Sequence, residues 1–249
     1  NSHPYWQPYL ALAEIAGVQA CWSQPIKNAQ GKVLGTFAIY SREPTTPTAE
    51  QLEKIKTYSN LAELAISRSL SSEQILRLAF YDSLTGLANR RLLEEHLLQA
   101  IAASKRSQKY CGLMFIDLDN FKPVNDLFGH KTGDKLLAEV AKRLQSTVRA
   151  ADTVARFGGD EFIVLLRDID TDSERSQQHM QLVATKIAQE LSRPYLVSHE
   201  KMHQCACSIG LVMFLGDTDS DELLRQADMA MYQSKREGRH IARWFSASS

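Results

Sequence analysis

The sequence is poor in cysteine, has no long apolar run and carries no excess of charge. Its four cysteines form no C-x-x-C pair and are too few for a secreted disulfide framework, so we expect a reducing compartment. It contains no run of about 18 apolar residues and no signal-peptide pattern. With 29 basic and 29 acidic residues, it offers no broad field for nucleic acid or an anionic membrane. These absences predict a cytoplasmic globular protein that holds any anionic ligand locally.

Two common glycine-rich phosphate loops, G-x-x-x-x-G-K-[ST] and G-x-G-x-x-G, are also missing. P-loop and dinucleotide-binding folds therefore lack their glycine signature here, and we expect any phosphate to be bound in another way. The chain has 249 residues, of which 44% are hydrophobic, enough for one large domain or two smaller ones. It begins abruptly beside aromatic residues, so we expect it to be part of a longer protein.

The first third of the chain divides at a proline-rich segment. Residues 1–48 combine a short helical pattern with two strands around a polar turn at Asn28–Gly31. Thr48 is a predicted cap for a long helix over residues 49–80. Apolar residues recur there every three or four positions and predict a narrow apolar stripe. Two interpretations stay open: a stalk paired with a second copy, or a helix packed on its own domain.

From residue 81 to residue 249, helical and strand patterns alternate. This alternation predicts a third segment with an α/β (α+β) fold, in which helices surround one mixed sheet. The strand CGLMFIDLD is apolar until its last residues, so we expect it to be buried, and TVARF and EFIVLLR flank two glycines as a hairpin. YLVSHE and MHQCACSIGLVMF predict a second hairpin, at 195–200 and 202–214. The remaining predicted elements are helices at 90–104, 133–148, 174–192 and 221–235, and a last strand at 241–245.

Two carboxylates stand at the predicted ends of these strands. Asp117 follows the apolar residues of its strand, where burial makes an unpaired charge costly. If the hairpin strand that begins at Asp160 lies beside it, both carboxylates come within reach of one hard divalent cation such as Mg²⁺. Gly158 and Gly159 suit the preceding turn because glycine tolerates positive φ angles and close backbone approach. The alternative is an ordinary Gly-Gly hairpin with solvated acidic residues.

The segment NFKPVNDLFGHKTGDK places polar residues around a predicted helix start. Free N–H groups at such a start bind anionic oxygens, and Lys122 adds a positive charge. Asn125 and Asp134 carry groups that can read a base, and the adjacent N–H donors of guanine suit Asp134. Taken singly, each polar residue is also typical of a helix cap or a turn.

Five ordered blocks of the sequence resemble the GGDEF family of bacterial diguanylate cyclases. The blocks are DSLTGLANRR (82–91), FIDLDNFKPVNDLFGHKTGD (115–134), RAADTVARFGGDEF (149–162), CSIG (207–210) and ADMAMYQSKREGR (227–239). The resemblance implies a fold related to the palm of nucleotidyl cyclases and polymerases. It also implies a transferase of bacterial second-messenger signalling, which joins two GTP molecules into cyclic di-GMP and releases two pyrophosphates.

The resemblance assigns roles by position. It makes Asp117, the Leu118 carbonyl and Asp160 ligands of Mg²⁺, with Mn²⁺ as an alternative. Glu161 would aid a second metal ion or activate the 3′-hydroxyl, and the identity of the general base stays open. The residues implied in GTP binding are Phe121, Lys122, Asn125, Asp134, Gly158, Gly159, Lys235 and Arg239.

An R-x-x-D pattern, Arg149 to Asp152, stands five residues before the glycines. The resembling family has its inhibitory site for the product at this position, so we expect cyclic di-GMP to bind there as an allosteric inhibitor. Arginine can bond the O6 and N7 edge of guanine or a phosphate, and the aspartate can accept from guanine N–H groups. The alternative interpretation is a surface ion pair.

The resemblance also implies partners. Each domain would hold one GTP, so two domains must face each other, which predicts a homodimer whose separation is set by the helix at 49–80. The segments ACWSQPI and GKVLGTFAIY resemble the C-terminal part of a GAF domain, so residues 1–48 are interpreted as a partial sensory segment. An alternative of another class is a weakly active module that binds GTP or cyclic di-GMP and regulates a partner domain, such as an EAL phosphodiesterase in a longer parent chain. Neither nucleic acid nor a membrane is an expected partner of this segment.

Overall fold

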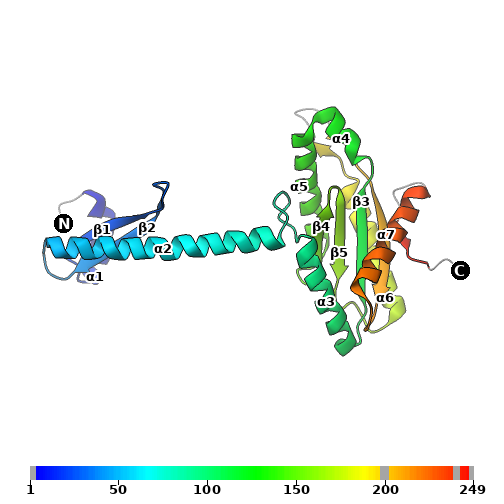
Figure 1. Ribbon diagram of the computed structural model, residues 1–249, viewed down its shortest axis with the longest axis horizontal. Coiled ribbons are helices and arrows are strands. Elements are labelled where there is room, and N and C mark those ends of the chain that lie inside the picture. The colour runs from blue at the N-terminus through cyan, green and yellow to red at the C-terminus, as the bar shows by residue number, and fades with distance from the viewer. Residues whose placement is uncertain (1–3, 197–201, 238–241, 247–249) are drawn as a thin grey trace. The chain divides into compact units, whose positions relative to one another are not determined.

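The computed structural model describes residues 4–196, 202–237 and 242–246. The chain divides into two compact units, Asn1–Leu76 and Arg77–Ser249 (Figure 1). The long helix α2, Ala49–Phe80, contributes residues to both units. No helix in the described ranges has the length and apolar content that a membrane span requires.

The first unit is built on an antiparallel β-hairpin with short helices before it and α2 after it. The side chain of Asn28 closes the hairpin turn, because its Oδ1 accepts hydrogen bonds from the backbone N–H groups of Gln30 (3.1 Å) and Lys32 (2.9 Å). The predicted hairpin and its polar turn are therefore confirmed. Besides α2, the elements of this unit are a 3-10 helix (Pro4–Tyr9), α1 (Leu10–Ile15), β1 (Ala20–Lys27) and β2 (Val33–Ser41).

Helix α2 begins with the predicted cap. Thr48 Oγ1 accepts a hydrogen bond from the Gln51 N–H (3.2 Å), and Gln51 Oε1 accepts one from the Thr48 N–H (2.9 Å), a reciprocal capping box. Ile55 is only 2% exposed, and the Tyr58 ring centroid lies 5.9 Å from that of Phe37 on β2. One side of α2 thus packs on its own unit, and pairing with a second copy stays a prediction. The apolar residues of α2 that remain more than half exposed are Leu52, Leu61, Leu64, Leu70, Ile75, Leu76 and Leu78.

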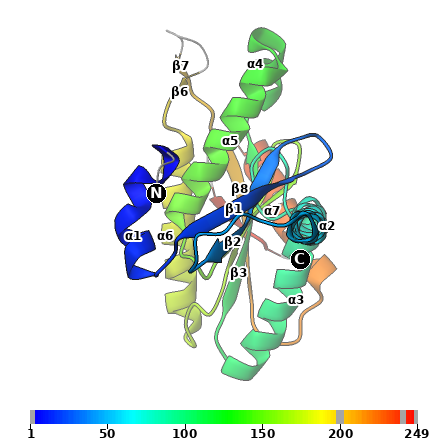
Figure 2. The ribbon, with the colours of Figure 1, turned by 90° about the vertical axis from the view of Figure 1, so that its left-hand side faces the viewer.

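The second unit is one five-stranded sheet with helices on both faces (Figures 1 and 2). The strand order is β4-β5-β3-β8-β9, antiparallel throughout except for the parallel pair β8 and β9. The predicted mixed sheet surrounded by helices is therefore confirmed. Its strands are β3 (Cys111–Leu118), β4 (Thr153–Gly158), β5 (Glu161–Leu166), β8 (Cys207–Phe214) and β9 (Ala242–Trp244), and its helices are α3 (Arg90–Ser107), α4 (Phe121–Phe128), α5 (His130–Thr147), α6 (Ser173–Leu191) and α7 (Ser220–Arg236).

Strand β3 separates two hydrophobic cores. All eight of its residues are buried, as expected for a central strand. Met114 and Ile116 belong to the core under α5 and α6, whereas Leu113 and Phe115 belong to the core under α3 and α7. Because successive side chains alternate between faces, Asp117 projects on the side of α3 and α7. The apolar pattern of β3 thus determines which face receives its terminal carboxylate.

Helix α7 lies against β8 at a glycine. A Cβ atom built on Gly210 would clash with the carbonyl oxygen of Ala227 and the backbone nitrogen of Met231, both in α7. These are backbone atoms, which cannot move aside as a flexible side chain can. The close approach of α7 to the sheet therefore requires glycine at position 210.

The second predicted hairpin is wrong in its extent. Strands β6 (Tyr195–Leu196) and β7 (Met202–His203) pair over two residues each, and part of the predicted first strand, 197–200, lies outside the described residues. β8 is a separate strand, which pairs with β3 along its whole length. The reason is a competing partner: the Asp119 N–H donates to the Ala206 carbonyl oxygen (2.8 Å), which aligns the chain with β3.

Candidate functional site

The end of β3 brings the predicted metal ligands together. Asp117 is 7% exposed and is the direct cross-strand partner of Glu161 on β5. Residues in direct opposition on antiparallel strands project from the same face of the sheet. The Leu118 N–H donates to the Asp160 carbonyl oxygen (3.2 Å), so the turn before β5 also abuts this end. Asp117, Leu118, Asp160 and Glu161 therefore meet at one corner of the sheet, as predicted from the sequence.

The turn between β4 and β5 differs from the prediction in one respect. Gly159 has a φ of 49°, in the left-handed region that favours glycine, whereas Gly158 has no such angle. A Cβ atom built at either position would meet no protein atom within 4 Å. The structure thus shows a positive φ angle at Gly159 but not at Gly158, so the turn itself requires glycine only at position 159.

The carboxylates at this corner disfavour one another's ionised forms. Burial raises the pKa of Asp117, the bonded ammonium of Lys235 opposes this rise, and the charge of Asp160 adds to it. Burial also raises the pKa of Glu161, and the charges of Asp117, Asp228 and Asp160 raise it further. The sheet corner therefore concentrates negative charge that a cation would stabilise.

Lys235, from α7, lies directly against this corner. Its Nζ is 2.7 Å from Asp117 Oδ2, in an ion pair whose aspartate side chain is 9% exposed. Within the described ranges, no group of three or more His, Cys, Asp or Glu side chains is arranged to hold a metal ion. The chemistry of the donors nevertheless fits a hard divalent cation, because carboxylate and carbonyl oxygens are its preferred ligands. Arg239, which was predicted to act with Lys235, lies outside the described residues.

Asp119 is a member of this corner that the sequence analysis missed. It is 5% exposed, and its Oδ1 accepts a hydrogen bond from Ser208 Oγ (2.9 Å) on β8. Its Oδ2 is buried and has no hydrogen-bond partner among the described residues. The available signal was the D-x-D spacing with Asp117 at the end of an apolar strand. An unpaired buried oxygen beside Asp117 also fits a nearby cation or a water bound to one.

Helices α4 and α5 bring together the predicted guanine-binding residues. Asn125, on α4, lies against Gly133 on α5, where a Cβ atom would clash with Asn125 Oδ1. Asp134 is the next residue of α5 and is exposed. Lys122 is exposed in the first turn of α4, whereas Phe121 is 9% exposed and contributes to the core. Asn125 and Asp134 are thus neighbours across the α4–α5 junction, while Lys122 faces solvent.

The R-x-x-D segment forms a closed turn between α5 and β4. Asp152 Oδ2 accepts a hydrogen bond from the Arg149 N–H (3.0 Å), and Asp152 Oδ1 accepts one from the Arg167 N–H (3.1 Å). Arg149 is exposed, and among the described residues its contact with Asp152 is the backbone one. Asp152 thus binds two backbone N–H groups, while Arg149 is exposed to solvent.

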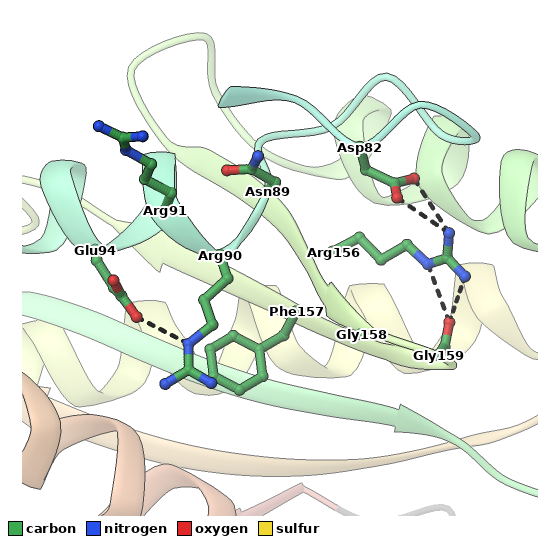
Figure 3. A pocket seen from close by; sticks show the side chains of 9 residues that line it. All are labelled: Asp82, Asn89, Arg90, Arg91, Glu94, Arg156, Phe157, Gly158 and Gly159. Carbon is green, nitrogen blue, oxygen red and sulfur yellow. Dashed lines mark hydrogen bonds and ion pairs between the residues drawn. The ribbon is translucent and has the colours of Figure 1, made fainter. Parts of the chain in front are cut away.

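An open pocket of about 540 Å³ is lined by Gly158 and Gly159 of the turn, together with residues of α3, β4 and the segment at Asp82 (Figure 3). Arg156 crosses it, with its guanidinium bonded to the carboxylate of Asp82 and to the carbonyl oxygen of Gly159. Arg90 stacks over the Phe157 ring, 4.7 Å from its centroid, and binds Glu94 Oε1 (2.8 Å). This pocket could not be predicted from the sequence, because Asp82 and Arg156 are 74 residues apart.

Comparison with known proteins shows the family. The family model "Diguanylate cyclase, GGDEF domain" matches residues 79–240, and the GAF domain model matches residues 1–66. The diguanylate cyclase DgcP of Escherichia coli is 30% identical over 239 residues, which cover 93% of this chain and 68% of that protein. The bifunctional diguanylate cyclase/cyclic di-GMP phosphodiesterase MucR of Pseudomonas aeruginosa is 40% identical over 186 residues, 74% of this chain and 26% of MucR. The chain thus spans only about a quarter of the length of MucR.

Solved structures agree with this assignment. The GGDEF domain of YfiN (TpbB) from Pseudomonas aeruginosa has a TM-score of 0.61 and 34% identity, covering 66% of this chain and 99% of that one. The coiled coil and GGDEF domain of DgcB from Caulobacter crescentus, in complex with c-di-GMP, has a TM-score of 0.67 and 26% identity, covering 78% of this chain and all of that one. The range that the GGDEF model matches contains strands β3, β4, β5 and β8, the acidic corner at Asp117 and Glu161, and the glycine turn before Asp160. The chain therefore belongs to the GGDEF family of diguanylate cyclase domains, with GAF-type sequence before the cyclase domain.

Proposed function

We propose that this chain is a diguanylate cyclase, which condenses two GTP molecules into cyclic di-GMP and two pyrophosphates. The observation that carries the proposal is the pairing of Asp117 with Glu161 at the end of a fully buried strand. Burial raises the pKa of both carboxyl groups; the charge of Asp160 adds to the rise at Asp117, and the charge of Asp117 adds to the rise at Glu161. Such strained acidic groups are typical of functional sites.

The residues that would hold a divalent cation, Mg²⁺ or Mn²⁺, are Asp117, the Leu118 carbonyl, Asp160 and Glu161. When bound, the cation neutralises phosphate charge and polarises the α-phosphoryl group under attack. Glu161 is also suited to accept a proton, because its raised pKa brings it closer to the operating pH. Lys235 lies at the same corner, within reach of a phosphate oxygen near Asp117.

The remaining GTP contacts follow from the chemistry of the predicted binding residues. The backbone of Phe121 and Lys122 at the start of α4 would donate to phosphate oxygens, together with Gly158, Gly159, Lys235 and Arg239. Asn125 and Asp134 would recognise the guanine base across the α4–α5 junction. Proximity and orientation would then supply much of the rate enhancement.

The reaction needs two such sites facing each other, so we propose a homodimer. Exposed leucines along α2 provide apolar surface that a second copy of the helix would bury. We also propose that Arg149 and Asp152 bind cyclic di-GMP as a feedback inhibitor. The exposed guanidinium of Arg149 supports this, because it is free to bond a guanine edge or a phosphate.

A second candidate function is a regulatory module with little turnover. The protein NbdA of Pseudomonas aeruginosa, named a cyclic di-GMP phosphodiesterase, is 38% identical over 246 residues, 98% of this chain and 30% of NbdA. Its name refers to phosphodiesterase activity only. In a longer protein of that kind, the present segment would bind GTP or cyclic di-GMP and regulate an EAL-type phosphodiesterase domain.

One experiment separates the two functions. The chain is incubated with GTP and Mg²⁺, and cyclic di-GMP and pyrophosphate are quantified, with Asp160→Ala and Glu161→Ala as test variants. Asp217→Ala, at a fully surface ion pair with Lys105, is the matched control. Product formed by the wild type and the control but not by the two variants supports the cyclase. Retained GTP binding without any product, at protein concentrations that favour dimers, supports the regulatory module.

A further inference from the structure

The side chain of Arg156 makes four hydrogen bonds that join two distant parts of the second unit (Figure 3). Its Nε and Nη2 donate to the Gly159 carbonyl oxygen at 3.0 and 2.8 Å. Its Nη1 donates to both carboxylate oxygens of Asp82 at 3.2 Å each. Both side chains are largely buried, with 14% of the arginine and 21% of the aspartate exposed. This pair is therefore well shielded and stronger than an ordinary surface ion pair.

The aspartate end of this link is itself fixed. Asp82 Oδ1 accepts hydrogen bonds from the Thr85 N–H (2.8 Å) and the Thr85 hydroxyl (2.6 Å). The backbone N–H of Asp82 donates to the Leu87 carbonyl oxygen (2.8 Å), which closes the loop on itself. Burial raises the pKa of Asp82, but the bonds from Thr85 and the charge of Arg156 outweigh it and lower the pKa overall. Asp82 is therefore a charged anchor in a rigid loop.

That loop is tied to the end of α2. Asn89 Nδ2 donates to the Ala79 carbonyl oxygen (2.9 Å), and the Asn89 N–H donates to the Phe80 carbonyl oxygen (2.9 Å). The Arg156 N–H donates to the Ala88 carbonyl oxygen (2.9 Å), so β4 is joined to the same loop. A continuous set of hydrogen bonds thus runs from the last turn of α2 to the carbonyl group of Gly159, directly before Asp160.

We propose that Arg156 is a positioning residue. It holds the turn at Gly158 and Gly159 (the glycine turn) against the loop of residues 81–89 (the Asp82 loop), and thereby sets the position of Asp160 and Glu161. This inference rests on the proposed cyclase function for its consequence in catalysis. A direct role in ligand binding is disfavoured, because Nε, Nη1 and Nη2 are all engaged within the protein. Arg90 and Arg91 of the same pocket differ, since both side chains are more than 60% exposed.

The test uses two conservative variants of the full chain and a matched control. Arg156→Lys keeps the charge but loses the planar fork, and Asp82→Asn keeps the shape but loses the charge. Arg143→Lys is the control, because Arg143 is 16% exposed and also donates to backbone carbonyl groups, those of Glu190, Arg193 and Pro194, away from the glycine turn. We measure kcat, KM for GTP and the Mg²⁺ concentration at half-maximal rate, together with amide hydrogen exchange.

In both test variants we expect kcat to fall about 100-fold, because a displacement of the catalytic carboxylates by about 1 Å lowers the rate by about that factor. KM for GTP should change by less than about threefold. The half-saturating Mg²⁺ concentration rises, and amide exchange accelerates in peptides covering residues 156–162 but not in those covering β3. The double variant is no worse than the poorer single variant, because both act through one link. Arg143→Lys leaves kcat and the exchange of the turn unchanged.

Two results would overturn the inference. The first is unchanged kcat in both test variants, and the second is exchange that accelerates equally throughout the sheet, which identifies a general structural role. If the wild-type chain makes no cyclic di-GMP, the proposed function fails, and hydrogen exchange alone then decides. Acceleration confined to residues 156–162 would still support the positioning role, and its absence would refute it.

Discussion

Asp117 and Glu161 are direct cross-strand partners, and burial raises the pKa of each. Ionisation of these two groups at neutral pH therefore lowers the free energy of unfolding of the second unit. The candidate active site thus reduces the stability of this unit. Without a cation, the acidic corner is a local weak point of an otherwise well-packed sheet.

The first prediction concerns stability. A carboxyl group whose pKa is raised on folding contributes stability below its unfolded pKa and loses it as the pH rises through its folded pKa. Asp117→Asn, which cannot ionise, should therefore raise the melting temperature of the second unit by a few degrees at pH 7.5, on the scale of about 2–4 °C per kcal/mol. The gain should shrink as the pH falls towards about 4, the ordinary range of an aspartate.

Calorimetry of the metal-free chain between pH 4 and pH 8 measures this effect. Asp217→Asn, in an exposed pair with Lys105, is the control and should shift the melting temperature little at any pH. A gain that does not depend on pH would refute the electrostatic explanation, as would a loss of stability at pH 7.5.

Lys235→Met should weaken GTP binding. Lys235 lies beside Asp117, so its removal takes away a charge-assisted contact with phosphate, worth about 1.5–3 kcal/mol. KM for GTP should rise by roughly 10- to 100-fold on that scale. Steady-state kinetics with Lys105→Met as a surface control checks the effect. An unchanged KM would remove Lys235 from the phosphate site.

Gly133→Ala should disturb the guanine site through Asn125. Alanine ordinarily favours a helix over glycine by about 0.5–1 kcal/mol, so a loss of function cannot come from helix propensity. The new Cβ atom would displace the amide of Asn125 instead. KM for GTP should rise about tenfold, the effect of one hydrogen bond to a base.

A double variant provides the control for this prediction. Asn125→Ala combined with Gly133→Ala should be no worse than Asn125→Ala alone, because the amide is already gone. Additive losses in KM would mean that Gly133 acts by another route.

Arg149→Ala should relieve product inhibition and leave the initial rate unchanged. Its side chain is exposed and lies in a turn outside the acidic corner, so the effect should appear only as cyclic di-GMP accumulates. The inhibition constant for added cyclic di-GMP should rise by at least tenfold. Asp152→Ala is a poorer probe, because the lost carboxylate also holds the N–H groups of Arg149 and Arg167. Identical inhibition curves for Arg149→Ala, the exposed control Arg175→Ala and the wild type would refute the inhibitory site.

Much of the sheet could be predicted because its signals are local. The apolar run before Asp117, the flanking strands of the glycine turn and the Thr48 cap each lie within a few residues, and the structure confirms all three. The sequence predicted that Asp117 lies near Asp160 only if their two strands are neighbours in the sheet. The register that makes Glu161, and not Asp160, the direct partner could not be read from the sequence.

What could not be predicted depends on contacts between distant residues. The link from Asp82 to Arg156 spans 74 residues, and neither residue is unusual in its own segment. The extent of β8 was misjudged for the same reason, since its alignment with β3 competes with the local hairpin. Buried Asp119 showed a signal, but its bond to Ser208 connects positions 89 residues apart.

Gly210, on β8, affects the position of Lys235 in the last turn of α7. Since a side chain there would press on the α7 backbone, any larger residue would act as a wedge and lift α7 off the sheet. This displacement of α7 would move the ammonium of Lys235 away from Asp117, although position 210 contacts neither residue. The absence of a side chain at position 210 thus keeps the Lys235 ammonium close to Asp117.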